Sequence, residues 1–196
     1  SAMGCLGSRA DTSYQPFLVE QIAKSIQQAA ENLEPAKIGW TVVKDYDHNH
    51  CRRWIYRPDR VADDPFGDRN VRAHMHPGHQ SQNHIAPSGP ADTDLSLLSV
   101  LATDGRPLAV LGNYALHYYG APLVSGDFCG RFGNQLAELI GANATERPFV
   151  GIMSQGTSGD SMWMDYGAPA GKRDLDQYTL EVARVAHGAY NSIAYH

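Results

Sequence analysis

Two apolar runs that each end in a dense polar cluster constrain the fold of this chain more than any other feature. The first run, residues 107–117, ends at His117, and the second, residues 148–154, leads into the polar, glycine-containing segment 155–160. Buried strands that deliver polar side chains at their ends form the sites of many α/β enzymes. The pattern therefore predicts a site at neighbouring strand ends, and it makes His117 the strongest candidate for chemistry among the nine histidines.

The patterns around these two runs predict a layered domain. Apolar residues recur at helical spacing, or alternate as in strands, between turn residues, and Asp-Gly between two apolar runs is a strong hairpin signal. The expected elements are helices at 17–33, 128–140 and 174–193, strands at 37–45 and 149–153, and a hairpin of 95–102 with 106–117. This order indicates one α/β domain over residues 1–196, with a mixed β-sheet core flanked by helices; an α+β arrangement is the alternative.

Composition narrows the classes of partner. The formal net charge is −5 over 196 residues, which argues against a nucleic acid held through phosphate contacts. No apolar run reaches the roughly 18–20 residues of a transmembrane segment. The three cysteines are spaced too widely and irregularly for a zinc ribbon or a redox pair. The chain is therefore expected to bind neither nucleic acid nor a membrane interior.

Histidines gather in a segment without periodicity, residues 46–94, where a short strand is expected at 53–56. A loop this long is unusual and is normally functional or contains short unrecognised elements. Pairs of histidines two residues apart would share one face of a strand, a spacing that some metal sites use. Solvated loop histidines are nevertheless the favoured interpretation of these pairs, which are His48 with His50 and His74 with His76.

Alternatives stay open for three residues around the predicted site. His117 is a zinc ligand, a general base, or a core histidine satisfied by one hydrogen bond. Asp127 orients a ligating histidine through its second ring nitrogen or caps the helix that follows. Arg52 binds an anion or polarises a carbonyl group, or it belongs to an ordinary ion-pairing surface.

The segment 156–160 has the appearance of a nucleophile turn but departs from it. The G-x-S-x-G pattern fails because its fifth residue is Asp160, so Ser158 is a weak candidate for a hydrolase nucleophile. A glycine-flanked turn whose backbone amides face a ligand is the more plausible interpretation.

Taken together, these segments resemble the neutral/alkaline, non-lysosomal ceramidase family, and in particular the N-terminal catalytic domain of its bacterial ceramidase-like members. The resemblance covers most of the chain in order. The segments that carry it are 108–117, 125–127 with Gly130, 149–160, and 51–54 with the loop that runs on to 77–78.

The resemblance implies a zinc-dependent amidohydrolase of sphingolipid metabolism that cleaves the N-acyl bond of ceramide. Its zinc would be held by two histidines, a Glu and a Tyr, with His117 as the second histidine and Asp127 behind it. The first histidine would lie just upstream of the small-residue segment 1–4, and the Glu and Tyr beyond His196. The chain would then be a catalytic domain truncated at both ends, acting on a lipid or other amide-containing small molecule, and secreted or periplasmic.

The largest departure from the family concerns the nucleophile. The family places its catalytic serine two residues after the aspartate of a Gly-Asp pair, and here Met162 occupies that position, with Ser161 one residue early. Three hypotheses follow: a zinc hydrolase, a non-catalytic relative that binds a lipid or glycan, and a serine hydrolase that uses Ser158. The catalytic candidates are Arg52, Ser158, Asp160 and Ser161.

Overall fold

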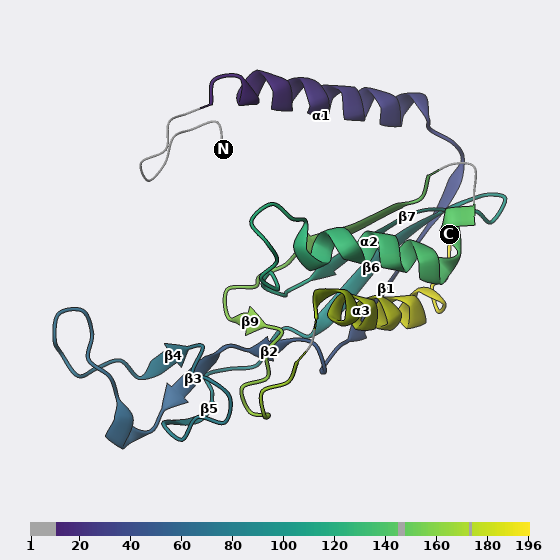
Figure 1. Ribbon diagram of the computed structural model, residues 1–196. Coiled ribbons are helices and arrows are strands. Elements are labelled where there is room, and N and C mark those ends of the chain that lie inside the picture. The colour runs from purple at the N-terminus through teal and green to yellow at the C-terminus, as the bar shows by residue number, and fades with distance from the viewer. Residues whose placement is uncertain (1–10, 145–147, 173) are drawn as a thin grey trace. The chain divides into compact units, whose positions relative to one another are not determined.

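A computed structural model describes residues 11–144, 148–172 and 174–196 of the chain (Figure 1). The chain divides into two compact units, Ser1–Pro35 and Ala36–His196. The small-residue segment 1–4, upstream of which the first zinc-binding histidine was expected, lies outside the described residues.

In the described residues of the first unit, 11–35, the chain forms helix α1 (Tyr14–Glu31), where the sequence predicted a helix at 17–33. Its entry is organised by Asp11, whose carboxylate accepts hydrogen bonds from the backbone N–H groups of Ser13 and Tyr14. An ion pair between Lys24 and Glu20, one turn apart, supports the exposed helix surface.

The second unit is built on a four-stranded sheet in the order β1-β6-β7-β8. β1 (Ala36–Lys44) pairs antiparallel with β6 (Asp94–Ala102), which forms a hairpin with β7 (Pro107–Tyr114). Gly105 takes a φ of 92° in the hairpin turn, a conformation that favours glycine, as the Asp-Gly signal predicted. β8 (Val150–Gln155) pairs parallel with β7, so the sheet is mixed.

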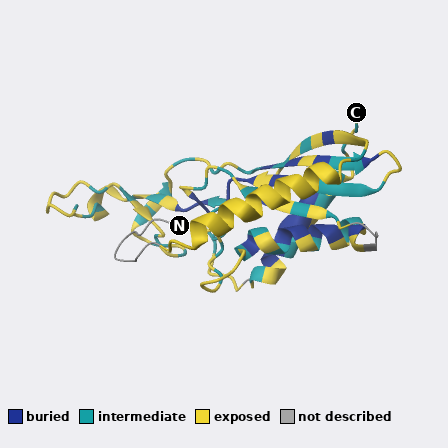
Figure 2. Ribbon diagram, turned by 90° about the horizontal axis from the view of Figure 1, so that it is seen from above, coloured by how far each residue is buried: buried dark blue, intermediate teal, exposed yellow. Residues whose placement is uncertain are grey.

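Two helices, α2 (Asp127–Ile140) and α3 (Leu175–Tyr190), pack on one face of this sheet and against each other. Gly141 ends α2 in a left-handed conformation, and the Asp174 side chain caps α3 by accepting from the Gln177 backbone N–H. The layer between the sheet and the two helices holds the hydrophobic core (Figure 2). The core consists of Leu95, Leu97, Val110, Tyr114, Leu116, Phe128, Phe132, Leu136, Met153, Tyr178, Val182, Ala183 and Ala186.

The other face of the sheet remains exposed. Alternate residues of β8, Val150 and Ile152, are 47% and 50% exposed, as are comparable positions of β1 such as Trp40. The prediction of a buried strand at 149–153 is therefore wrong for that face, because the helices of this unit, α2 and α3, cover the sheet on one side.

Short strands occupy the segment that lacked periodicity. β3 (Arg53–Tyr56) lies between β4 (Ala73–Met75) and β5 (His84–Pro87), and β2 (His50–Cys51) pairs with β9 (Ser161–Met162). The strand predicted at 53–56 is confirmed, and so is the fold class of a mixed sheet combined with helices. No helix in the described part of the chain is long and apolar enough to cross a membrane.

Candidate functional site

The carboxyl ends of β7 and β8 meet at one edge of the sheet, as the two apolar runs predicted. Tyr114 lies opposite Gln155 in the parallel register, and the Gly156 N–H donates to the Tyr114 carbonyl oxygen at 2.9 Å. A Cβ at Gly156 would stand 3.1 Å from the Ala115 Cα, so a glycine suits the close approach of the two chains. The polar segments after both strands are therefore held side by side.

His117 lies three residues beyond the end of β7 and is half-buried. Its Nδ1 is 3.4 Å from the Tyr118 carbonyl oxygen, a long contact, and its ring lies against the Tyr118 ring with centroids 4.2 Å apart. His117 is thus positioned at the strand end with partial access to solvent. It is not the fully buried core histidine that was one of the alternatives.

Asp127 anchors the loop that follows His117. Its carboxylate accepts four backbone N–H bonds: from Tyr119 and Phe128 at 2.7 Å each, from Gly120 at 3.0 Å and from Ala121 at 2.8 Å. Partial burial alone would raise the pKa of Asp127, but these four donors outweigh it and hold the pKa below its usual value. Asp127 therefore fixes residues 119–121 and, through them, the chain that carries His117.

Arg52 clamps the turn at 156–160 from the side. Its backbone N–H donates to the Asp160 carbonyl oxygen at 2.8 Å, while Nε and Nη2 donate to the Gly159 carbonyl oxygen at 3.2 and 2.8 Å. Arg52 is buried, which strengthens these charge-assisted bonds. The structure thus brings Arg52 and Asp160 together.

The two serines of this region differ in exposure. Ser161 is buried in β9, and its Oγ has no hydrogen-bond partner in the described part of the chain. Met162, at the position where the ceramidase resemblance would place the nucleophile, is also buried. Ser158 is half-buried in the turn and accepts the Ser161 N–H at 3.3 Å through its backbone carbonyl. Of the two hydroxyls, only that of Ser158 belongs to a residue with appreciable exposure.

Tyr166 and His76 join this cluster, and sequence reasoning did not single out Tyr166. His76 Nδ1 lies 2.5 Å from the Tyr166 Oη, and His76 Nε2 lies 3.4 Å from the Arg52 Nη1. His74 and His76 are both exposed, as predicted, but His74 lies in β4 and not in a loop, and His76 contacts Tyr166 and Arg52. No local pattern in the sequence indicates the contact of His76 with Arg52.

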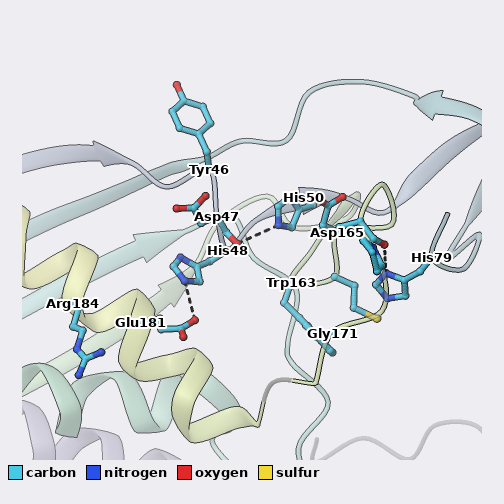
Figure 3. Close-up of a pocket in the computed structure, with 13 residues that line it drawn as sticks. Tyr46, Asp47, His48, His50, His79, Trp163, Asp165, Gly171, Glu181 and Arg184 are labelled. Carbon is cyan, nitrogen blue, oxygen red and sulfur yellow. Dashed lines mark hydrogen bonds and ion pairs between the residues drawn. The ribbon is translucent and has the colours of Figure 1, made fainter.

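A cavity of about 640 Å³ is formed by segments that adjoin these residues (Figure 3). On its wall, His48 Nδ1 lies 2.7 and 3.0 Å from the two Asp45 carboxylate oxygens, and Nε2 lies 3.3 Å from Glu181. His48 is only 7% exposed, so the interpretation of a solvated histidine is wrong for it: the nearby carboxylates offset the cost of burying the ring. The cavity is lined by Tyr46, Asp47, His48, His50, His79, Trp163, Met164, Asp165, Ala168, Pro169, Gly171, Glu181 and Arg184.

The fit of the described residues to a zinc ion is incomplete. Zinc sites in proteins use three or four ligands from Cys, His, Asp and Glu. Within residues 11–144, 148–172 and 174–196, no three such side chains are grouped so that they could hold a metal ion. His117 offers one imidazole, and these residues alone do not form a zinc site.

Of the comparisons with known proteins, the one with solved structures identifies a similar fold. No protein-family model matches the sequence, and no curated protein matches it significantly. The crystal structure of neutral ceramidase from Pseudomonas aeruginosa is similar over 89% of this chain and 25% of that chain, with a TM-score of 0.54 and 17% identity. A ceramidase complexed with C2 is similar over 89% and 24%, with a TM-score of 0.53 and 16% identity.

The chain therefore spans about a quarter of the length of the solved ceramidases that it resembles. At this identity the likeness establishes a shared fold: an α/β unit of the kind found in neutral ceramidases.

Proposed function

We propose that residues 1–196 are part of a ceramidase-like catalytic domain, and that the protein hydrolyses the N-acyl amide bond of a ceramide-like lipid. The observation that carries this proposal is that the parallel strands β7 and β8 end side by side, with His117 after the first and the Arg52-clamped turn after the second. The ceramidase-like fold around this site supports the choice of substrate class.

Amide hydrolysis places negative charge on the carbonyl oxygen, so the site must offer donors there. The glycine-flanked backbone at 156–160, held in place by Arg52, is suited to present N–H groups to that oxygen. In this proposal His117 contributes one imidazole to a zinc site, and zinc when bound would polarise the substrate carbonyl. Because the described ligand set is incomplete, the roles of the other groups are assigned without the metal.

Water is the proposed nucleophile, because Ser161 is buried and Met162 replaces the family's serine. Asp160 is exposed in the turn, and its carboxylate is the proposed acceptor of the proton that water releases. The water oxygen adds to the carbonyl carbon, the carbon–nitrogen bond breaks, and the leaving amine takes up a proton. The products are a fatty acid and an amino alcohol, with no acyl-enzyme.

The first experiment measures hydrolysis of a fluorescent N-acyl sphingosine and metal content on the full-length protein. We expect His117→Ala to lose at least about 100-fold in activity together with bound zinc, as loss of a metal ligand should. The matched control is His187→Ala, which alters a half-buried histidine in the last turn of α3. Unchanged zinc content in His117→Ala would exclude the ligand role. Binding of ceramide vesicles without hydrolysis would favour a non-catalytic relative.

A second experiment separates attack by water from attack by a serine. Rapid quenching followed by mass spectrometry should find no acylated peptide containing residues 156–162. Ser158→Ala should retain activity within about threefold. An acyl adduct on Ser158, or loss of activity in Ser158→Ala that chelators do not reproduce in the parent protein, would establish a serine hydrolase instead.

A further inference from the structure

Hydrogen bonds of defined direction connect His76 to the Arg52 clamp. An arginine can only donate, so the 3.4 Å contact between Arg52 Nη1 and His76 Nε2 requires a lone pair on Nε2. The proton of a neutral His76 is then on Nδ1 and is donated to the Tyr166 Oη at 2.5 Å. The Tyr166 hydroxyl donates onward to the Met164 Sδ at 3.8 Å. Every donor in this series of hydrogen bonds, from Arg52 to Met164, therefore has an acceptor only when His76 is neutral.

The backbone around His76 is shaped to make these contacts. His76 has a φ of 61°, in the left-handed region that few residues other than glycine adopt. Its backbone N–H donates to the Arg52 carbonyl oxygen at 3.0 Å, so the main chain and the side chain of His76 both engage Arg52. Four residues after His76, the Gln80 N–H donates to the Tyr166 carbonyl oxygen at 2.8 Å. The unfavourable φ of His76 is thus stabilised by contacts with Arg52 and by the hydrogen bond between Gln80 and Tyr166. Such a conformation persists only where the surrounding structure holds the residue in a defined position.

We propose that His76 is a positioning residue that orients the Arg52 guanidinium on the Gly159 carbonyl oxygen, and that it does so only in its neutral form. This inference rests on the proposed function for its catalytic consequence, because the turn at 156–160 is the one assigned to the reaction. Its structural consequence is independent of any activity. A proton on Nε2 would direct a second donor at Arg52 and break the contact.

The surroundings of His76 favour the neutral form. Partial desolvation, followed by the positive charge of Arg52 and by the neighbouring His117 and His74, lowers the pKa of His76 below its ordinary value. The Tyr166 hydroxyl faces Nδ1, the other ring nitrogen of His76. The centroid of the Tyr166 ring lies 5.3 Å from that of the His79 ring. The clamp is therefore complete at neutral pH and opens as the pH falls through the lowered pKa.

The test compares His76→Asn with His74→Asn in the full-length protein. Asparagine tolerates a positive φ but is too short to reach Arg52, so it removes the acceptor without adding backbone strain. We expect amide hydrogen exchange in residues 159–161 to become about fivefold faster in His76→Asn, the effect of one lost hydrogen bond, and to stay unchanged in His74→Asn. Tyr166→Phe, which removes the partner of Nδ1, should move exchange in the same direction.

Two further measurements complete the test. Nitrogen NMR of the His76 ring should show the Nδ1–H tautomer, and the acidic limb of the amide-hydrolysis pH profile should be altered in His76→Asn. The Nε2–H tautomer, or equal exchange in all variants, would overturn the positioning role. Altered exchange in a protein that hydrolyses no amide would preserve the clamp and remove the proposed function.

Discussion

Replacing Asp127 by Asn tests whether its carboxylate holds the loop after His117. Asn keeps the shape of the side chain and tolerates the φ of 51° at this position, so backbone strain stays constant. The amide oxygen can still accept the bonds of Oδ1, but the amide NH2 faces the N–H groups of Gly120 and Ala121, which lie 3.0 and 2.8 Å from Oδ2. Two charge-assisted bonds are therefore lost.

A hydrogen bond to a charged group contributes about 1.5–3 kcal/mol when it is well shielded from solvent. Asp127 is half-buried, so we discount each bond to about 1–1.5 kcal/mol. Two lost bonds predict that Asp127→Asn lowers the free energy of unfolding by about 2–3 kcal/mol at neutral pH. Urea-induced unfolding followed by tryptophan fluorescence measures this change, and hydrogen exchange at residues 119–121 locates it.

The pH dependence gives a second signature. The pKa of Asp127 is lower in the folded protein than in the unfolded chain, so its stabilisation is present above the ordinary aspartate pKa. It is lost as the pH falls through the lowered folded-state pKa, so the difference between Asp127→Asn and the parent protein should shrink progressively once the pH falls below the ordinary aspartate pKa.

Asp68→Asn is the matched control, because Asp68 is exposed, and we expect it to change the unfolding free energy by less than about 0.5 kcal/mol. The reasoning is refuted if Asp127→Asn and Asp68→Asn unfold at the same urea concentration at neutral pH, or if the amides at 119–121 keep their protection.

Four other substitutions probe the packing around the site by urea unfolding. Gly151→Ala should destabilise by about 1–3 kcal/mol, because its Cβ would lie 2.6 Å from the α2 backbone; Gly159→Ala, with no atom within 4 Å, should be near neutral. Ser161→Ala should cost less than about 1 kcal/mol, because it removes a buried hydroxyl without a partner among the described residues. His48→Ala should cost about 3–5 kcal/mol at neutral pH, because it leaves the Asp45 carboxylate buried beside an empty space; a cost near zero would contradict the buried pair.

Elements with local signals were predictable from the sequence. The hairpin turn needs a positive φ at Gly105, and the end of α2 needs one at Gly141, so glycine at each position marks its element. Burial was less predictable, because it depends on which face of a strand another element covers. Val150 and Ile152 belong to an apolar run, yet both face away from the helices.

The same distinction applies to the site. The sequence predicted that His117 and the segment 155–160 lie at neighbouring strand ends, because each follows an apolar strand. The contact of Arg52 with Gly159 joins residues 107 positions apart, and it depends on the two-residue pairing of β2 with β9, which is too short to show a period. The burial of His48 likewise depends on Glu181, 133 positions away.

The ceramidase resemblance would place a serine where this chain has Met162, but the contacts that hold the turn do not use that side chain. Arg52 binds the carbonyl oxygens of Gly159 and Asp160, so the clamp acts on the backbone alone. Met162 is buried, which is a packing role that a serine would fill poorly. A turn held by backbone contacts keeps its shape whichever side chain stands at position 162. This is why we assign the attack to water and test the turn separately from the chemistry.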